Sequence, residues 1–130
     1  MTNTARALYI FFSGFGLLAF PENNVPDEYP DEFGTMHPVM LPYITYELLR
    51  PDRLRQAPFH ARIWYRSNSF TEITAKADTI RRTIEGGHSI HTGDGALRIW
   101  PDDNFLQFQP PDEPELKIAY LSMIIEIDYN

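Results

Sequence analysis

Cysteine is absent from this 130-residue sequence. Disulfides, thiol catalysis and cysteine-ligated zinc or iron–sulfur sites are therefore excluded, whereas any cellular compartment stays open. Basic residues are also few, because 11 Lys and Arg stand against 18 Asp and Glu, which gives a net charge of −7. Nucleic-acid binding needs clustered Lys and Arg to replace phosphate counterions, so this charge balance argues against it.

The sequence has no apolar run of the ~20 residues that a membrane span requires. The longest candidate, residues 3–20, is interrupted by Ser13, Gly14 and Gly16. We interpret it as one amphipathic core helix and expect no membrane contact. A secretory signal is the alternative, but Arg6 is the only basic residue at its start and no small-x-small cleavage site follows.

Recognised catalytic and phosphate-binding motifs are missing as well: there is no G-x-S-x-G, no P-loop and no His-Glu-x-x-His. His88 and His91, followed by Asp94, could in principle hold a metal, but residues three apart on a strand point to opposite faces. The acidic clusters at residues 27–32 and 112–115 are interleaved with proline, so we interpret them as solvated loop charge rather than as calcium ligands or a glycosidase pair. We therefore expect no metal, no cofactor and no enzymatic activity.

What the sequence does contain is a globular composition, with 43% hydrophobic and 14% aromatic residues, which predicts a single domain over residues 1–130. Its best-defined element is a helix within residues 67–87. Ser69 and Glu72 have the spacing of a capping box, and Gly86–Gly87 can end the helix in the left-handed conformation. One apolar stripe follows from the spacings of 3, 4, 3 and 4 between Phe70, Ile73, Ala77, Ile80 and Ile84.

Alternating apolar and polar residues predict strands in the remaining segments. These are residues 43–49, 59–66, 89–92, 96–100, 105–109 and 116–129. Residues 93–95 and 101–104 are expected to be turns. Residues 43–49 and 59–66 are expected to pair as an antiparallel hairpin with a long loop, and residues 89–92 and 96–100 as a second hairpin. The last strand is expected to be the longest and central, with a helix on one side. The prediction is an α+β fold in the order α-β-β-α-β-β-β, with three or four strands after the second helix, and a mainly antiparallel sheet of about five strands packed by two helices.

Residues 21–42 form a proline-rich arm or loop, whose five prolines rule out a continuous helix or a central strand. Such long loops often carry function, although a disordered connector is an equally good interpretation. Trp64 lies on the less apolar face of its strand and is either core, under the N-terminal helix, or an interface anchor. The residues that we expect to contact partners are Val25, Pro26, Tyr29, Phe33, Trp64, Pro111 and Glu113.

Several motifs, taken in order and spacing, resemble one family. They are F-F-S-G-F-G and A-F-P-E-N-N-V-P-D within residues 11–27, L-P-Y-I-T-Y-E at 41–47, W-Y-R-S-N-S-F-T-E-I-T-A-K-A-D-T-I at 64–80, A-L-R-I-W at 96–100 and I-A-Y-L-S-M-I-I-E-I at 118–127. Together they resemble the small tail-terminator, or tail-completion, proteins of long-tailed bacteriophages and related prophages. The resemblance spans nearly the whole chain, but Leu17–Leu18 and residues 29–33 depart from the pattern by enriching the N-terminal part.

The resemblance implies a structural virion protein without catalytic residues. Such a protein forms a ring, typically a hexamer, at the head-proximal end of the tail tube, where it ends tube polymerisation and joins the tail to the head connector. Its partners would be further copies of itself, the tube protein and the head–tail completion protein, while the genome passes through the channel without specific binding. Assembly would take place in the host cytoplasm. A head-side connector or neck ring is the alternative within phage biology, and a small monomeric binding module is the alternative of a different class.

Overall fold

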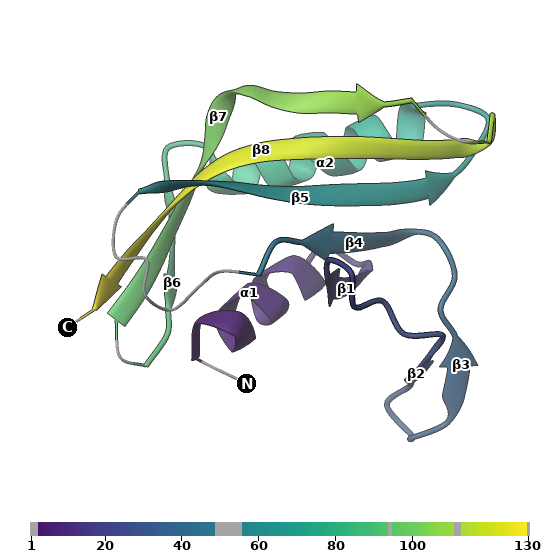
Figure 1. Ribbon diagram of the computed structural model, residues 1–130, viewed down its shortest axis with the longest axis horizontal. Coiled ribbons are helices and arrows are strands. Elements are labelled where there is room, and N and C mark those ends of the chain that lie inside the picture. Colours follow the sequence, from purple (N-terminus) through teal and green to yellow (C-terminus); the bar gives the residue numbers. More distant parts are fainter. Residues whose placement is uncertain (1–2, 49–55, 94, 111–112, 130) are drawn as a thin grey trace.

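The computed structural model describes residues 3–48, 56–93, 95–110 and 113–129 (Figure 1). Two helices and eight strands follow one another in the described chain. They are α1 (Asn3–Ser13), β1 (Leu18–Pro21), β2 (Glu28–Pro30), β3 (Met36–Pro38), β4 (Tyr43–Tyr46), β5 (Ala57–Arg66), α2 (Thr71–Ile84), β6 (His88–His91), β7 (Gly95–Gln109) and β8 (Leu116–Tyr129).

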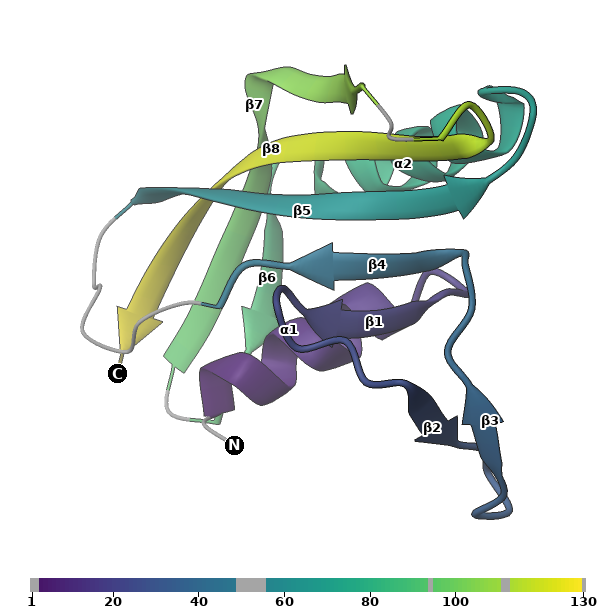
Figure 2. The ribbon, with the colours of Figure 1, turned by 45° about the vertical axis from the view of Figure 1, so that its right-hand side comes forward.

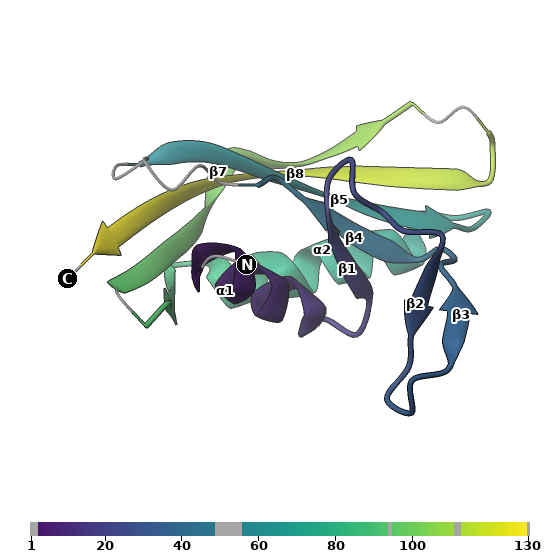
Figure 3. The same cartoon turned by 60° about the horizontal axis from the view of Figure 1, so that its bottom comes forward.

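Six of these strands form one curled sheet in the order β1-β4-β5-β8-β7-β6, and β2 and β3 form a separate two-stranded hairpin. Neighbours in the sheet are antiparallel except for β1 and β4, which run parallel. Both helices lie on the same side of the sheet (Figure 3), with α2 against β5, β7 and β8 and α1 between the two edge strands β1 and β6. The protein is therefore an α+β protein with a mostly antiparallel sheet, as predicted.

The core lies between the helices and the facing side of the sheet. Alternate residues of β5 and β8 point into it, and one stripe of α2 covers them. Phe12 of α1 stacks between two aromatic rings of the sheet, 5.1 Å from Tyr46 and 6.1 Å from Phe59. Buried residues of these elements include Leu8, Phe12, Ile44, Tyr46, Phe59, Ala61, Ile63, Tyr65, Ile73, Ala77, Ile80, Ile84, Leu121, Met123, Ile125 and Ile127.

The predicted hairpins and the central strand are confirmed. β4 pairs antiparallel with β5, β6 pairs antiparallel with β7, and β8 lies between β5 and β7 with α2 packed on one face. The prediction that the last strand is the longest is wrong, because β7 has 15 residues and β8 has 14. Residues 101–104, expected to be a turn, instead lie within β7 and shift its register with β8 between Pro101 and Leu106, which is a β-bulge.

The first predicted helix is too long. α1 ends at Ser13, and residues 18–21 form the edge strand β1. Gly14 donates its backbone N–H to the Phe11 carbonyl, and Gly16 has a φ of 81°, a conformation that a residue with a side chain rarely adopts. The two glycines thus turn the chain back along the sheet, although the apolar pattern continues past them.

The helix within residues 67–87 is confirmed, but its predicted capping box is wrong. The N-cap residue is Phe70 and it makes no side-chain capping bond. The hydroxyl of Ser69 accepts from the Thr71 backbone N–H at 3.4 Å, so it closes a short turn before the helix instead of capping it. At the other end, Gly86 and Gly87 have φ of 82° and 97°, which confirms the predicted glycine termination.

Candidate interaction surfaces

The proline-rich segment is more ordered than expected, because part of it folds as an antiparallel hairpin. We call residues 27–39, which contain β2 and β3, the hairpin arm. Its strands pair Glu28 with Pro38 and Pro30 with Met36, and the Val39 N–H donates to the Asp27 carbonyl at 2.8 Å. Proline is tolerated here because a two-stranded hairpin has only edge strands. The hairpin arm projects from the body of the protein beside β1 and β4 (Figure 2).

One carboxylate fixes the tip of the hairpin arm. Asp31 Oδ1 accepts from the backbone N–H groups of Phe33 and Thr35, each at 2.9 Å, and its Oδ2 lies 2.7 Å from His37 Nε2. Gly34 completes the turn with a φ of 82°. The hydrogen bond with His37, and then those from the backbone of Thr35 and Phe33, lower the pKa of Asp31. The tip is therefore held in one conformation by its own side chains.

The apolar side chains of this segment do not reach the core. Phe33 is 85% exposed and Met36 is 53% exposed, while Met40 beyond the hairpin is 70% exposed. Tyr29 is half-buried with its ring centre 5.8 Å from that of His37. The hairpin arm thus presents a large aromatic side chain to solvent at the end of a stiff projection, which is the arrangement expected of a contact residue.

A second group of side chains lies on the sheet face that carries no helix. Glu22 Oε2 lies 2.7 Å from His60 Nε2 and 3.3 Å from Arg62 Nη1. Glu47 Oε1 lies 3.4 Å from the other ring nitrogen of His60, and the Tyr120 ring stacks on the imidazole at 5.2 Å. We call these five residues the polar cluster. These contacts link the members of the polar cluster to one another across the helix-free face of the sheet.

Trp64 belongs to the same face, so the interpretation that places it under the N-terminal helix is wrong. It is half-buried, its Nε1 donates to Thr45 Oγ1 at 3.0 Å, and its ring lies 6.0 Å from that of Tyr43. Val25, which is 37% exposed, lines the same shallow depression as Trp64 and Arg62. The structure thus brings together two of the predicted contact residues, 39 positions apart in the sequence.

Pro26 and Glu113 do not line this depression. Pro26 is exposed at the base of the hairpin arm. Glu113 is exposed and pairs with Arg66 at 2.8 Å, while Pro111 lies outside the described residues. Of the histidine candidates, His88 packs against Phe11 with the two rings tilted and their centres 5.2 Å apart. Asp94 also lies outside the described part, within which no three histidine or acidic side chains come together so as to hold a metal.

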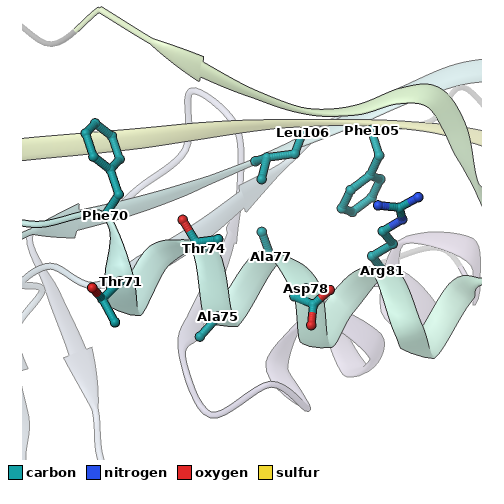
Figure 4. A pocket seen from close by; sticks show the side chains of 9 residues that line it. All are labelled: Phe70, Thr71, Thr74, Ala75, Ala77, Asp78, Arg81, Phe105 and Leu106. Carbon is teal, nitrogen blue, oxygen red and sulfur yellow. The ribbon is translucent and has the colours of Figure 1, made fainter.

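Sequence reasoning missed a groove between α2 and the distal half of β7, which we call the α2–β7 groove (Figure 4). Phe105 and Leu106 reach from β7 toward the helix, and Arg81 rises beside Phe105. Phe70, expected in the buried stripe, is 47% exposed and packs on Phe108 with ring centres 4.7 Å apart. The lining residues are Phe70, Thr71, Thr74, Ala75, Ala77, Asp78, Arg81, Phe105 and Leu106.

Compared with known proteins, the sequence matches no protein-family model and has no significant match among curated proteins. Within the described residues, neither α1 nor α2 has the length and apolar character needed to cross a bilayer.

Proposed function

We propose that this protein is a structural ring subunit that caps the head-proximal end of a phage tail tube, ends tube polymerisation and joins the tail to the head connector. The observation that carries the proposal is the hairpin arm, which projects from a well-packed α+β body and exposes 85% of Phe33. A fixed, exposed aromatic tip is an arrangement that an assembly subunit can bury against a neighbour, because aromatic side chains are common anchors of protein interfaces.

Three further features support the proposal. The sequence motifs resemble tail-terminator proteins along nearly the whole chain, and the protein has the α+β class that this resemblance implies. A closed ring needs different patches of one subunit to meet, and the hairpin arm and the sheet faces are different patches. The net charge of −7 disfavours retention of a genome that passes through a central channel, because phosphates are held by basic side chains.

The best-supported role is therefore non-enzymatic. The alternative of a head-side connector or neck ring rests on the same features, since it is also a ring that contacts two different neighbours. The position of the chain within a particle separates these two roles. A small monomeric binding module would instead use the depression beside Trp64, which is lined by Val25, Tyr43 and Arg62 as well.

The test is electron microscopy of the protein mixed with the tube subunit of the same phage. We expect a ring at one end of each tube and tubes that stop growing when the protein is added in excess. Free rings that bind a head connector but not a tube would favour the neck-ring role. Tubes that keep growing, with the protein monomeric by sedimentation beside them, would contradict both ring roles.

A further inference from the structure

We propose that the tip of the hairpin arm of one subunit seats in the α2–β7 groove of a second copy of this chain. Phe33 would be the apolar anchor, and the acidic side chains around it would face Arg81. The inference rests on the proposed ring function, because it names the contact that joins one ring subunit to the next.

The hairpin arm is suited to insertion because its tip is already fixed. Asp31 accepts hydrogen bonds from the backbone N–H groups of Phe33 and Thr35, and its second oxygen meets His37. Phe33 is 85% exposed at this turn. A residue that is presented in a single backbone conformation loses little conformational entropy on binding, so more of the contact energy is available for association.

The α2–β7 groove offers matching apolar surface. Phe70 and Phe108, at 47% and 42% exposure, are among the exposed large hydrophobic residues of the described chain, and their rings lie 4.7 Å apart. Leu106 and Phe70 both line the groove (Figure 4). An aromatic side chain from a neighbour would cover this surface, as anchors in protein interfaces fill pockets that exclude water.

The charges of the two surfaces are complementary. On the hairpin arm, Glu28 and Glu32 are exposed and form no ion pair with the described residues. In the groove, Asp78 is paired with Arg82 at 2.6 Å, which leaves Arg81 as the exposed cation without an ion-pair partner among the described residues. Negative arms repel one another and attract a positive groove, so the charges favour arm-to-groove contacts over arm-to-arm contacts.

The position of the two surfaces makes the contact intermolecular. The hairpin arm connects β1 and β4 at one side of the sheet, whereas the groove borders β7, which is separated from β4 by β5 and β8. The views of Figures 1 and 2 agree that the arm points away from α2 and β7. A contact between different patches of identical chains is heterologous, and it closes into a ring when the rotation between subunits permits.

Cysteine cross-linking tests the contact directly, because the chain has no cysteine of its own. Thr35→Cys places a thiol beside Phe33, and Thr74→Cys places one in the groove; both positions are exposed. Under oxidation on assembled rings, we expect the double variant to give a ladder of covalent oligomers that collapses under reduction. The matched control pairs Thr35→Cys with Thr83→Cys, an exposed residue of α2 outside the groove, and should give at least tenfold less ladder.

A charge exchange provides the second, independent measurement. Glu32→Arg and Arg81→Glu should each weaken self-association about tenfold, and their combination should restore it, because opposite charges again face each other. Arg6→Glu, at an exposed position of α1 outside the groove, is the control for the change in net charge. Equal weakening by Arg6→Glu, or no recovery in the double exchange, would overturn the assigned contact.

The two proposals can fail separately. Rings at tube ends without arm-to-groove cross-links would overturn the inferred contact and leave the ring function standing. Arm-to-groove cross-links in a protein that never binds tube ends would support the contact and contradict tube capping. A chain that is monomeric under all conditions, with and without tubes, would overturn both.

Discussion

Glu22 and His60 are 38 positions apart in the sequence, yet Glu22 Oε2 lies 2.7 Å from His60 Nε2. Glu22 directly follows β1, where the chain leaves the sheet toward the hairpin arm, and His60 is in β5. The same carboxylate also accepts from Arg62 Nη1 at 3.3 Å. This contact lies on the helix-free face and connects Glu22, where the chain leaves β1 toward the hairpin arm, to β5. β5 is two strands inward from the sheet edge that β1 forms.

Glu22→Gln should weaken the contact of residue 22 with His60 and Arg62. The substitution keeps the shape of the side chain but removes its charge, and hydrogen bonds to charged groups contribute more than neutral ones, so we expect the free energy of unfolding to fall by about 1 kcal/mol. Denaturant unfolding measures this value. Glu32→Gln, at an exposed position of the hairpin arm, is the matched control and should leave stability unchanged. Equal effects of the two variants would show that the loss of acidic charge, not the contact, is responsible.

Acid should release the tip of the hairpin arm. The pKa of Asp31 is lowered in the folded state, first by the hydrogen bond with His37 and then by the backbone of Thr35 and Phe33. Its stabilising contribution is thus fully present above the ordinary aspartate pKa of 3.8 and is lost as the pH falls through the lowered value. The protection of the Phe33 and Thr35 amides against hydrogen exchange, measured by NMR relative to the intrinsic rate at each pH, should fall in that range. Asp31→Asn should show weaker protection already at neutral pH, whereas Asp27→Asn should behave as wild type.

Tyr29→Ala combined with Phe33→Ala should weaken assembly at least tenfold without unfolding the body. Phe33 contacts solvent rather than the core, and Tyr29 packs on His37 within the hairpin arm. We expect the free energy of unfolding to change by no more than about 0.5 kcal/mol, as for other surface substitutions. Sedimentation reports assembly and thermal melting reports stability. A large fall in melting temperature would show that the arm belongs to the core.

Phe12→Ala should be among the most destabilising substitutions in α1. Phe12 is fully buried and stacks on Tyr46, so its removal leaves a cavity between the helix and the sheet, and the expected loss is about 3–5 kcal/mol. Ile10→Ala, at a position that is 60% exposed in the same helix, is the control and should cost far less. Denaturant unfolding with unchanged m-values would compare them on one scale. Similar losses in both variants would contradict the placement of α1.

Alkaline pH should destabilise the fold through buried tyrosines. Burial raises the pKa of Tyr43, Tyr46 and Tyr65 above the ordinary value of 10.0, and the charge of Tyr9 adds to the effect on Tyr46. The raised pKa means that the stabilising contribution is complete below pH 10 and is lost as the pH rises through the folded-state values. Absorbance at about 295 nm follows tyrosinate formation, and Tyr46→Phe should reduce the alkaline loss of stability. Titration of all the tyrosines as a single population near pH 10 would contradict this expectation.

The parts of the fold that could be predicted from the sequence are those in which periodicity reports burial directly. The alternating pattern of residues 59–66 corresponds to β5, and the stripe of Ile73, Ala77, Ile80 and Ile84 is buried on α2. Phe70 belongs to the same stripe by spacing, but it lies at the N-cap, before the first residue of α2, and its ring remains half exposed. Periodicity identifies which face of a helix is apolar, but it does not show how far along the helix the sheet covers that face.

The parts that could not be predicted depend on local glycine geometry or on register between distant strands. Residues 101–104 contain proline and acidic residues typical of turns, yet pairing with β8 at Pro101 and again at Leu106 keeps the strand continuous through a bulge. The polar cluster exists because Arg62 is opposite both Thr45 and Tyr120 in the register, and no local pattern indicates that pairing. The hairpin arm was predicted as a contact surface, but the groove proposed to receive it was not.

The parallel pairing of β1 and β4 has a mechanical consequence. Because the strands run in the same direction, the segment that carries the hairpin arm, residues 22–42, leaves at the end of β1 and returns at the start of β4. Its two attachment points therefore lie at opposite ends of the strand pair, about 10 Å apart for four-residue strands, and its two halves meet only at the base of the hairpin, where Val39 bonds to Asp27. A load at the tip is divided between these two attachment points, which resists tilting better than a single stem. The Glu22 N–H extends the pairing to the Tyr46 carbonyl at 2.8 Å. A force that a neighbouring subunit exerts on the tip would therefore be distributed over both β1 and β4. The orientation of the hairpin arm relative to the sheet would be maintained by these two attachments.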